Sequence, residues 1–148
     1  MEANLDKRYQ TLLVLWGAQL MSIGMFFLVT LLVAPELSNE SGSVPGRSIL
    51  IVVLTALGTV LVIVSFSVKS KILERAVERQ DVNLVQKALV IACAMCEVSA
   101  LLGLIDRFVI GDSSSYYLLF LLAAGGIAFH FPRRSQVEAA SYKTPGLT

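Results

Sequence analysis

The sequence is poor in the residues that build catalytic and metal sites. Its 148 residues include one histidine and two cysteines, and the net charge is +1. One histidine and a single cysteine pair make no metal-ligand cluster, and a nearly neutral chain lacks the charge that attracts nucleic acid. The sequence contains no nucleotide-binding loop or nucleophile motif either. We therefore predict no metal, no cofactor, no nucleic-acid partner and no enzymatic activity.

Charge is also absent from long stretches of the chain. Apolar residues make up 55% of the composition and the mean hydropathy is +0.73, which is typical of a membrane protein. Three charge-free runs have 26, 21 and 16 residues, namely 9–34, 48–68 and 116–131, and a helix needs ~20 apolar residues to cross a bilayer. A fourth apolar stretch, 84–109, carries the acid Glu97 near its middle.

A lone strand cannot cross lipid with its backbone unpaired, so these stretches are predicted to be helices. We predict an all-α integral membrane protein: one domain over residues 1–148, with four transmembrane helices in an up-down bundle. A cleaved signal peptide is the alternative for the first run, but 26 residues exceed the ~7–15 of a signal-peptide core. The run 116–131 is short for a crossing, and its interfacial residues Tyr116 and Tyr117 would extend it.

The charged segment 69–83 is expected to continue the second helix out of the membrane and to turn near Asp81. The polar tail 132–148 is expected to be loosely ordered. His130, near the end of the run 116–131, is interpreted as a residue of the membrane interface.

Lysine and arginine counts indicate the orientation of the chain. In the four-span arrangement ten of the twelve basic residues lie on one side: Lys7, Arg8, Lys69, Lys71, Arg75, Arg79, Lys87, Arg133, Arg134 and Lys143. Basic residues are enriched on the cytoplasmic side of membrane proteins. We therefore expect both termini and the segment 69–83 to be cytoplasmic, in a multi-pass protein of the cell membrane.

Glu97 is the candidate functional residue, because a charge at bilayer depth is unfavourable unless it faces protein or water and has a partner. The first and third predicted helices run in the same direction, which should put Gln19 and Ser22 at a depth similar to that of Glu97. We hypothesise a hydrogen bond between Gln19 and a protonated Glu97, since burial disfavours the charged carboxylate. Ser22 is a second possible hydrogen-bond partner.

Small residues recur every four positions along the third predicted helix: Ala88, Ala92, Cys96 and Ala100, with Gly103 beside them. Helices in lipid approach one another through small residues, so this stripe predicts a helix–helix seam. Small residues are common in membrane helices generally, and the four-residue repeat is what favours a seam. Cys93 and Cys96 could form a redox or metal pair; packing is the preferred interpretation because no second ligand pair exists.

The turn Arg79-Gln80-Asp81 and the segment Ala94-Met95-Cys96-Glu97-Val98-Ser99-Ala100-Leu101-Leu102-Gly103-Leu104 resemble the c subunit, or proteolipid, of rotary F-type ATP synthases. That family has a helical hairpin with a cytoplasmic Arg-Gln-Pro turn and a carboxylate midway along its second helix. The resemblance covers Glu78 to Leu104 and implies that Glu97 picks up and releases H+ or Na+. The second span differs from the family's glycine-rich first helix in having only Gly58, and Asp81 replaces the loop proline.

Two functions remain open at this stage. The first is a small non-catalytic membrane protein, an accessory or structural component of a larger membrane complex. The second is proteolipid-like proton or cation handling through Glu97 in a homo-oligomer. An intramembrane enzyme is disfavoured, because His130 and Glu97 are expected at different depths. In each case the lipid bilayer is the first partner.

Overall fold

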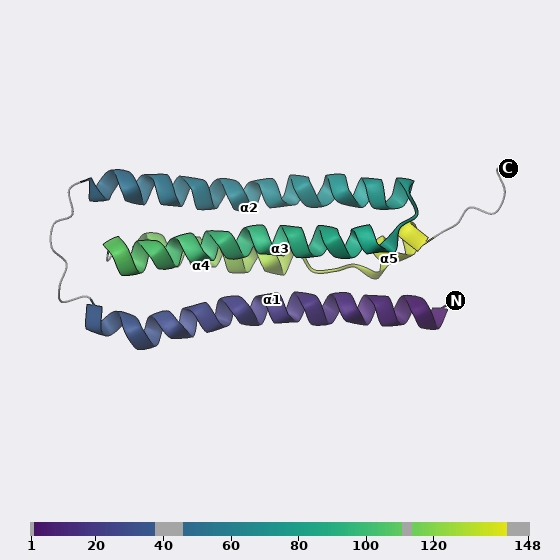
Figure 1. Cartoon of the computed structure of the whole chain (residues 1–148), viewed down its shortest axis with the longest axis horizontal. Helices are drawn as coiled ribbons and strands as arrows, with labels where there is room; N and C mark the ends of the chain where they lie inside the picture. The colour runs from purple at the N-terminus through teal and green to yellow at the C-terminus, as the bar shows by residue number, and fades with distance from the viewer. Residues whose placement is uncertain (1, 38–45, 111–113, 142–148) are drawn as a thin grey trace.

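The computed structural model of the chain describes residues 2–37, 46–110 and 114–141, and it confirms the all-α class over these residues (Figure 1). The elements are α1 (Glu2–Leu37), α2 (Arg47–Glu78), α3 (Val82–Ile105), the π-helical turn η1 (Asp106–Ile110), α4 (Ser114–Phe129) and α5 (Arg134–Ser141). Three helical segments are long and apolar enough to span a membrane: Leu5–Val33, Arg47–Glu78 and Val82–Val109. The fourth predicted span corresponds to α4, which passes this test only together with α5, as a pair bent by 51°.

The four long helices alternate in direction, and α3 and α4 lie between α1 and α2 (Figure 1). Within the described residues α1 and α2 do not touch, whereas α3 packs against α1, α2 and α4. The span that contains α3 is the most buried of the three. In its most apolar window 44% of the residues are buried inside the protein, compared with 17% for α2 and 11% for α1. The helix that carries Glu97 is therefore the centre of the bundle, and α1 and α2 are its outer members.

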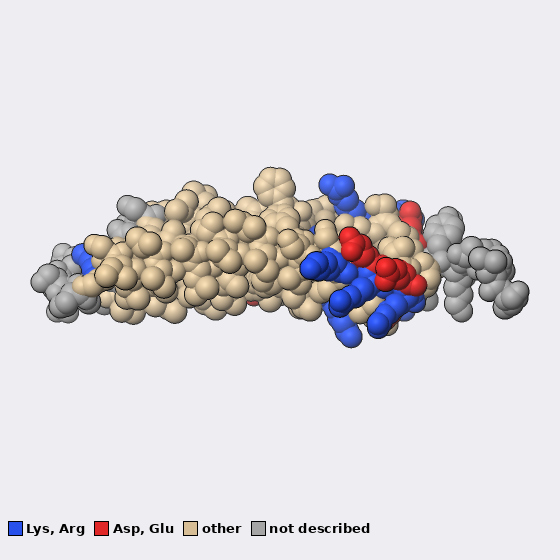
Figure 2. All heavy atoms as spheres, turned by 90° about the horizontal axis from the view of Figure 1, so that it is seen from above, with Lys and Arg blue, Asp and Glu red and all other residues tan. Residues whose placement is uncertain are grey.

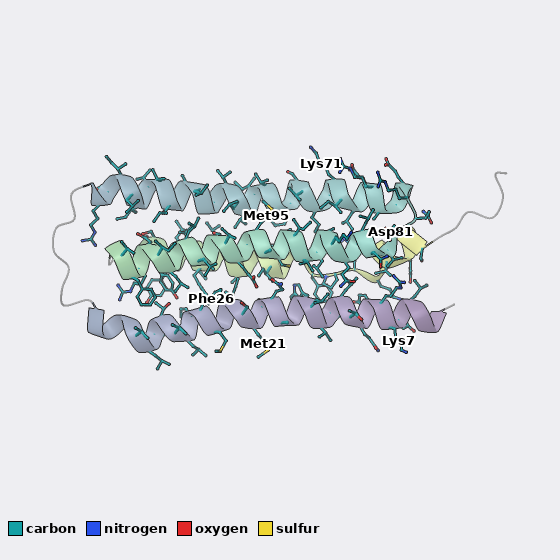
Figure 3. All side chains as sticks on the ribbon, in the orientation of Figure 1. Lys7, Met21, Phe26, Lys71, Asp81 and Met95 are labelled. Atoms are coloured by element: carbon teal, nitrogen blue, oxygen red, sulfur yellow. The ribbon has the colours of Figure 1, made fainter. Side chains whose placement is uncertain are left out.

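The inward face of α1 carries polar side chains as well as apolar ones, because Gln19 and Ser22 are partly buried and Thr30 is buried. In Figure 3, Phe26 points toward α3 and α4 and Met21 points away from the bundle. Met21 is 74% exposed, whereas Phe26 packs against the core. Exposed apolar side chains of this kind are expected on a helix whose outer face is covered by lipid.

The turn between α2 and α3 is short and locally determined. Gln80 adopts a left-handed conformation (φ 50°), and the next amide, of Asp81, donates to the carbonyl of Ala76 at 3.0 Å. This is the hydrogen-bond pattern of a Schellman motif, which satisfies the last carbonyls of a helix. Asp81 then accepts a hydrogen bond from the amide of Asn83 at 2.9 Å and caps α3. One turn therefore ends α2 and begins α3.

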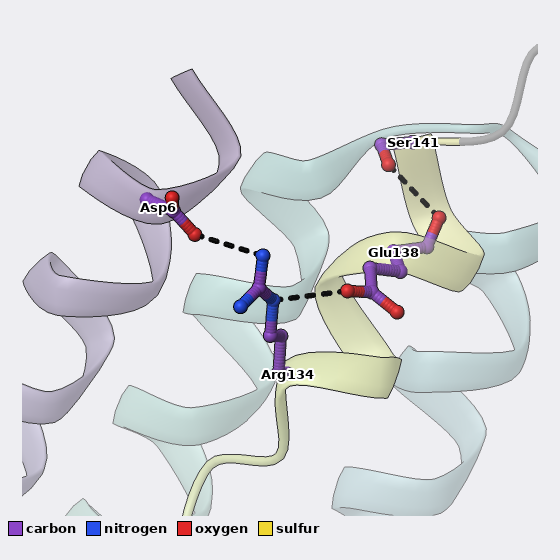
Figure 4. Close-up of polar contacts among 4 residues, drawn as sticks. All are labelled: Asp6, Arg134, Glu138 and Ser141. Carbon is purple, nitrogen blue, oxygen red and sulfur yellow. Dashed lines mark hydrogen bonds and ion pairs between the residues drawn. The ribbon is translucent and has the colours of Figure 1, made fainter. Parts of the chain in front are cut away.

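The tail expected to be loosely ordered contains the helix α5. Its residues Val137 and Ala140 are buried, and it packs against α1, α2 and α3. Arg134 pairs with Asp6 of α1 and with Glu138 of α5 at 3.0 Å each (Figure 4). A short amphipathic helix is marginal in isolation, so this one owes its stability to the bundle it packs on.

Charged side chains gather at one end of the molecule. Figure 2 shows them over the end of the bundle near the α2–α3 turn, next to a long belt without charges. Five exposed residues of α2 and the turn carry them there: Lys71, Glu74, Arg75, Glu78 and Arg79. The start of α1 and α5 lie at the same end (Figure 1).

Glycines allow the three helices α2, α3 and α4 to meet closely. A Cβ atom at Gly58 would lie 2.5 Å from Leu119 and 2.9 Å from Ser99, and one at Gly126 would lie 2.7 Å from the sulfur of Cys96. The stripe of small residues on α3 is buried: Ala88, Ala92, Cys96, Ala100 and Gly103. Gly125, one residue away from Gly126, has open space at the same position.

Candidate functional site

Glu97 of α3 is a partly buried carboxyl group that faces α1. The end of the Gln19 side chain lies against it, with one terminal atom 2.6 Å from Oε1 and 3.2 Å from Oε2. The hydroxyl of Ser22, almost one helical turn further along α1, also hydrogen-bonds Glu97. The structure thus brings together the three polar residues singled out in these two spans.

The orientation of the Gln19 amide depends on the charge of Glu97. With its nitrogen toward the carboxyl group, the amide donates to both oxygens of an ionised Glu97, at 2.6 and 3.2 Å. With its oxygen in the same place, it accepts the proton of a neutral Glu97, and 2.6 Å is a normal length for such an O–H···O bond. Rotation of the terminal amide therefore lets Gln19 partner either form of the acid.

A second polar cluster lies on another face of α3, between α2, α3 and α4. Nε2 of His130 is 2.8 Å from the hydroxyl oxygen of Ser65, which is 3.7 Å from the sulfur of Cys96. The Ser65 hydroxyl also lies 2.6 Å from the carbonyl of Val62 and donates to it. Because a hydroxyl has one proton, the 2.8 Å bond is then donated by the imidazole, which assigns the histidine proton to Nε2.

His130, which was predicted to lie at the membrane interface, is buried between the helices of the bundle. Its side chain is 1% exposed, and its contact Ser65 touches Cys96, the residue that precedes Glu97. Adjacent residues of a helix differ in height by ~1.5 Å. The His130 ring and Glu97 therefore lie at similar depth on different faces of α3, and the two were expected at different depths.

Two side chains from other helices bind the carboxyl end of α4 and hold His130 inside the bundle. Nε1 of Trp16 donates to the carbonyl of Ile127 at 2.8 Å, and Nζ of Lys69 donates to the carbonyl of His130 at 2.9 Å. The last carbonyls of a helix have no intrahelical partner, and a cation near them is favoured by the helix dipole. Side chains from α1 and α2 thus satisfy α4 where it ends inside the bundle.

Sequence reasoning missed Lys69, Ser65 and the burial of Asp106. Lys69 was counted as a cytoplasmic charge, yet it is 9% exposed. Asp106 is fully buried in the π-helical turn η1. A lysine one residue beyond a charge-free run is the only sequence signal for the first of these.

The described residues hold no group of three or more histidine, cysteine or acidic side chains placed to bind a metal ion. Both cysteines are free and buried. Compared with protein-family models, curated proteins and solved structures, the chain has no match in any of the three.

Proposed function

We propose that this chain is a four-span protein of the cell membrane without catalytic activity, and that it serves as an accessory or structural component of a larger membrane complex. In this proposal α4 and the residues up to 131 form the fourth crossing, and α5 lies on the cytoplasmic side. Both termini and the α2–α3 turn lie in the cytoplasm.

The observation that carries this proposal is that two clusters of interior polar side chains find hydrogen-bond partners within the same chain. Glu97 binds Gln19 and Ser22 across the α1–α3 contact, and Ser65 binds His130 across the α2–α4 contact. Hydrogen bonds between membrane helices contribute ~0.5–2 kcal/mol each. Side chains used in this way hold the bundle together and leave the outer faces of α1 and α2 to contact lipid or the helices of other proteins.

The distribution of charge supports the orientation. The exposed charged residues of α2 and its turn lie at the end that also contains α5 and the start of α1. An excess of lysine and arginine beside apolar helices is typical of the cytoplasmic side.

Thiol labelling in intact cells tests the four spans. Single cysteines placed at the exposed positions Ser48, Glu78 and Ser135, in a chain with both native cysteines replaced by alanine, report the side of each segment. An impermeant maleimide should label Ser48→Cys from outside, and the other two only after lysis. Labelling of Ser135→Cys from outside would exclude a fourth crossing.

Proton or cation handling through Glu97 in an oligomer is the second candidate, and it rests on the resemblance to the ATP synthase proteolipid. One observation favours it: the Gln19 amide can partner both protonation states of Glu97, so a proton could come and go without loss of the contact.

Carbodiimide labelling separates the two candidates, because the reagent attacks protonated carboxyl groups in apolar surroundings. pH-dependent modification of Glu97 that abolishes ion flux in reconstituted vesicles would favour ion handling. Modification without any flux, together with a defined set of membrane proteins that co-purify in mild detergent, would favour the accessory role.

A further inference from the structure

A groove follows the contact between α1 and α3 at the charged end of the bundle. It consists of three adjoining hollows of about 510, 230 and 310 Å³. The first and second share Arg8 and Thr11, and the second and third share Asn83 and Gln86. The shared walls place the three hollows side by side, from the surface of α1 across to the surface of α3.

The rim of the groove is basic and has no acidic partner. Lys7 and Arg8 line it on α1 and Lys87 lines it on α3. All three are exposed, and within the described residues none of them forms a salt bridge. Nη1 of Arg8 donates to Oδ1 of Asn83 at 3.3 Å, which links the two helices across the groove. The neighbouring acids are already engaged, since Asp6 pairs with Arg134 at 3.0 Å and Asp81 caps α3.

The groove changes from polar to apolar along the helices. Its basic residues stand where the charge-free run of α1 begins, at Tyr9, and next to the apolar face of α3. One to two turns further into the uncharged belt its walls are Val14 and Leu15 on α1 and Val90 and Ile91 on α3. A ligand that fits this gradient has an anionic head and an apolar tail. Basic pockets between membrane helices at the cytoplasmic side bind the head groups of anionic lipids.

We propose that this α1–α3 groove is a binding site for an anionic phospholipid of the cytoplasmic leaflet. Lys7, Arg8 and Lys87 contact its phosphate, the amides of Asn83 and Gln86 hydrogen-bond the polar head, and an acyl chain lies along the apolar walls. The proposal goes beyond the accessory role, because it assigns a specific lipid class to one seam of the bundle.

Native mass spectrometry of the purified full-length chain in mild detergent tests the site, with phosphatidylglycerol and phosphatidylcholine as probes. The wild type should bind phosphatidylglycerol at least ten times more tightly. The variant Lys7→Gln/Arg8→Gln/Lys87→Gln should lose about fivefold in affinity for phosphatidylglycerol per removed charge, or about a hundredfold in all. Phosphatidylcholine, whose phosphate is balanced by its choline cation, should lose much less. These three side chains are exposed, so the variant should fold as the wild type does.

The matched control removes the same charge elsewhere at the same end. Lys71→Gln/Arg75→Gln/Arg79→Gln alters exposed residues of α2 and its turn, and Figure 3 shows Lys71 on the opposite side of the bundle from Lys7. This control should keep full affinity for phosphatidylglycerol. An equal loss in both triple variants, or no loss in the first, would overturn the proposal. Displacement of the lipid by millimolar glycerol phosphate would also overturn it, because the site would then take a free phosphate group.

Discussion

Replacement of Gly126 by alanine is the sharpest test of how the helices pack. The added Cβ would lie 2.7 Å from the sulfur of Cys96 and 3.1 Å from a methyl group of Val62. Ordinary contacts between carbon atoms are ~3.5–4.0 Å, so α4 must move away from both α2 and α3. Cys96 cannot easily give way, because it is fully buried and touches Ser65.

The expected loss is that of an overpacked core, about 1–3 kcal/mol in the free energy of unfolding. Gly125→Ala is the matched control, since nothing lies within 4 Å of its added Cβ. Alanine is a better helix former than glycine by ~0.5–1 kcal/mol, so this control should be neutral or slightly stabilising. We therefore expect a difference of about 2 kcal/mol between two changes that add the same methyl group at adjacent positions.

Denaturant titration in mixed micelles measures this difference, with the emission of Trp16 as the signal. Trp16 is the only tryptophan, and its indole nitrogen binds the carbonyl of Ile127, one residue after Gly126. Its emission therefore reports the docking of α1 on α4. Adding Cys96→Ala to Gly126→Ala should recover part of the loss, because the Val62 contact at 3.1 Å remains. If Gly126→Ala and Gly125→Ala unfold at the same denaturant concentration, the close approach of α2, α3 and α4 is refuted.

Three further changes test the polar contacts. Glu97→Ala leaves the Gln19 amide without its partner and should lower the free energy of unfolding by about 1–3 kcal/mol. Glu97→Gln should lower it by less than about 1 kcal/mol. Equal losses for the two variants in the denaturant titration would count against the contact. Trp16→Phe removes the donor to the Ile127 carbonyl and should lower stability by about 0.5–1.5 kcal/mol, measured by circular dichroism melts; an unchanged melt would contradict the capping of α4. Arg134→Gln should lower stability by less than about 1 kcal/mol, and only at low salt, because its ion pairs are exposed; a loss that persists in high salt would contradict this.

The long helices could be predicted because apolar runs of this length leave the backbone no other way to satisfy its hydrogen bonds in lipid. The approach of Gln19 to Glu97 could be predicted by counting residues along the two helices. Gln19 lies about ten residues beyond Arg8, Glu97 lies about ten residues beyond Lys87, and the two helices run in the same direction. Register along parallel helices is therefore available from sequence, because the rise per residue is constant.

The depth of His130 could not be predicted in this way. Pro132 ends α4 locally, but the side chains that satisfy its last carbonyls inside the bundle, Trp16 and Lys69, come from 111 and 61 residues away in the chain. No local pattern encodes those contacts. The helix α5 escaped prediction for a similar reason, because it has only 8 residues and a helix of that length depends on the bundle it packs against.

The central claim is that the acid of α3 joins helices and does not carry ions. Proton and sodium flux into vesicles that contain the wild type or the Glu97→Gln variant, at matched protein content, tests it most directly. The accessory role predicts that both give the same flux as protein-free vesicles across the pH range. A flux that the wild type supports and the variant abolishes would contradict it.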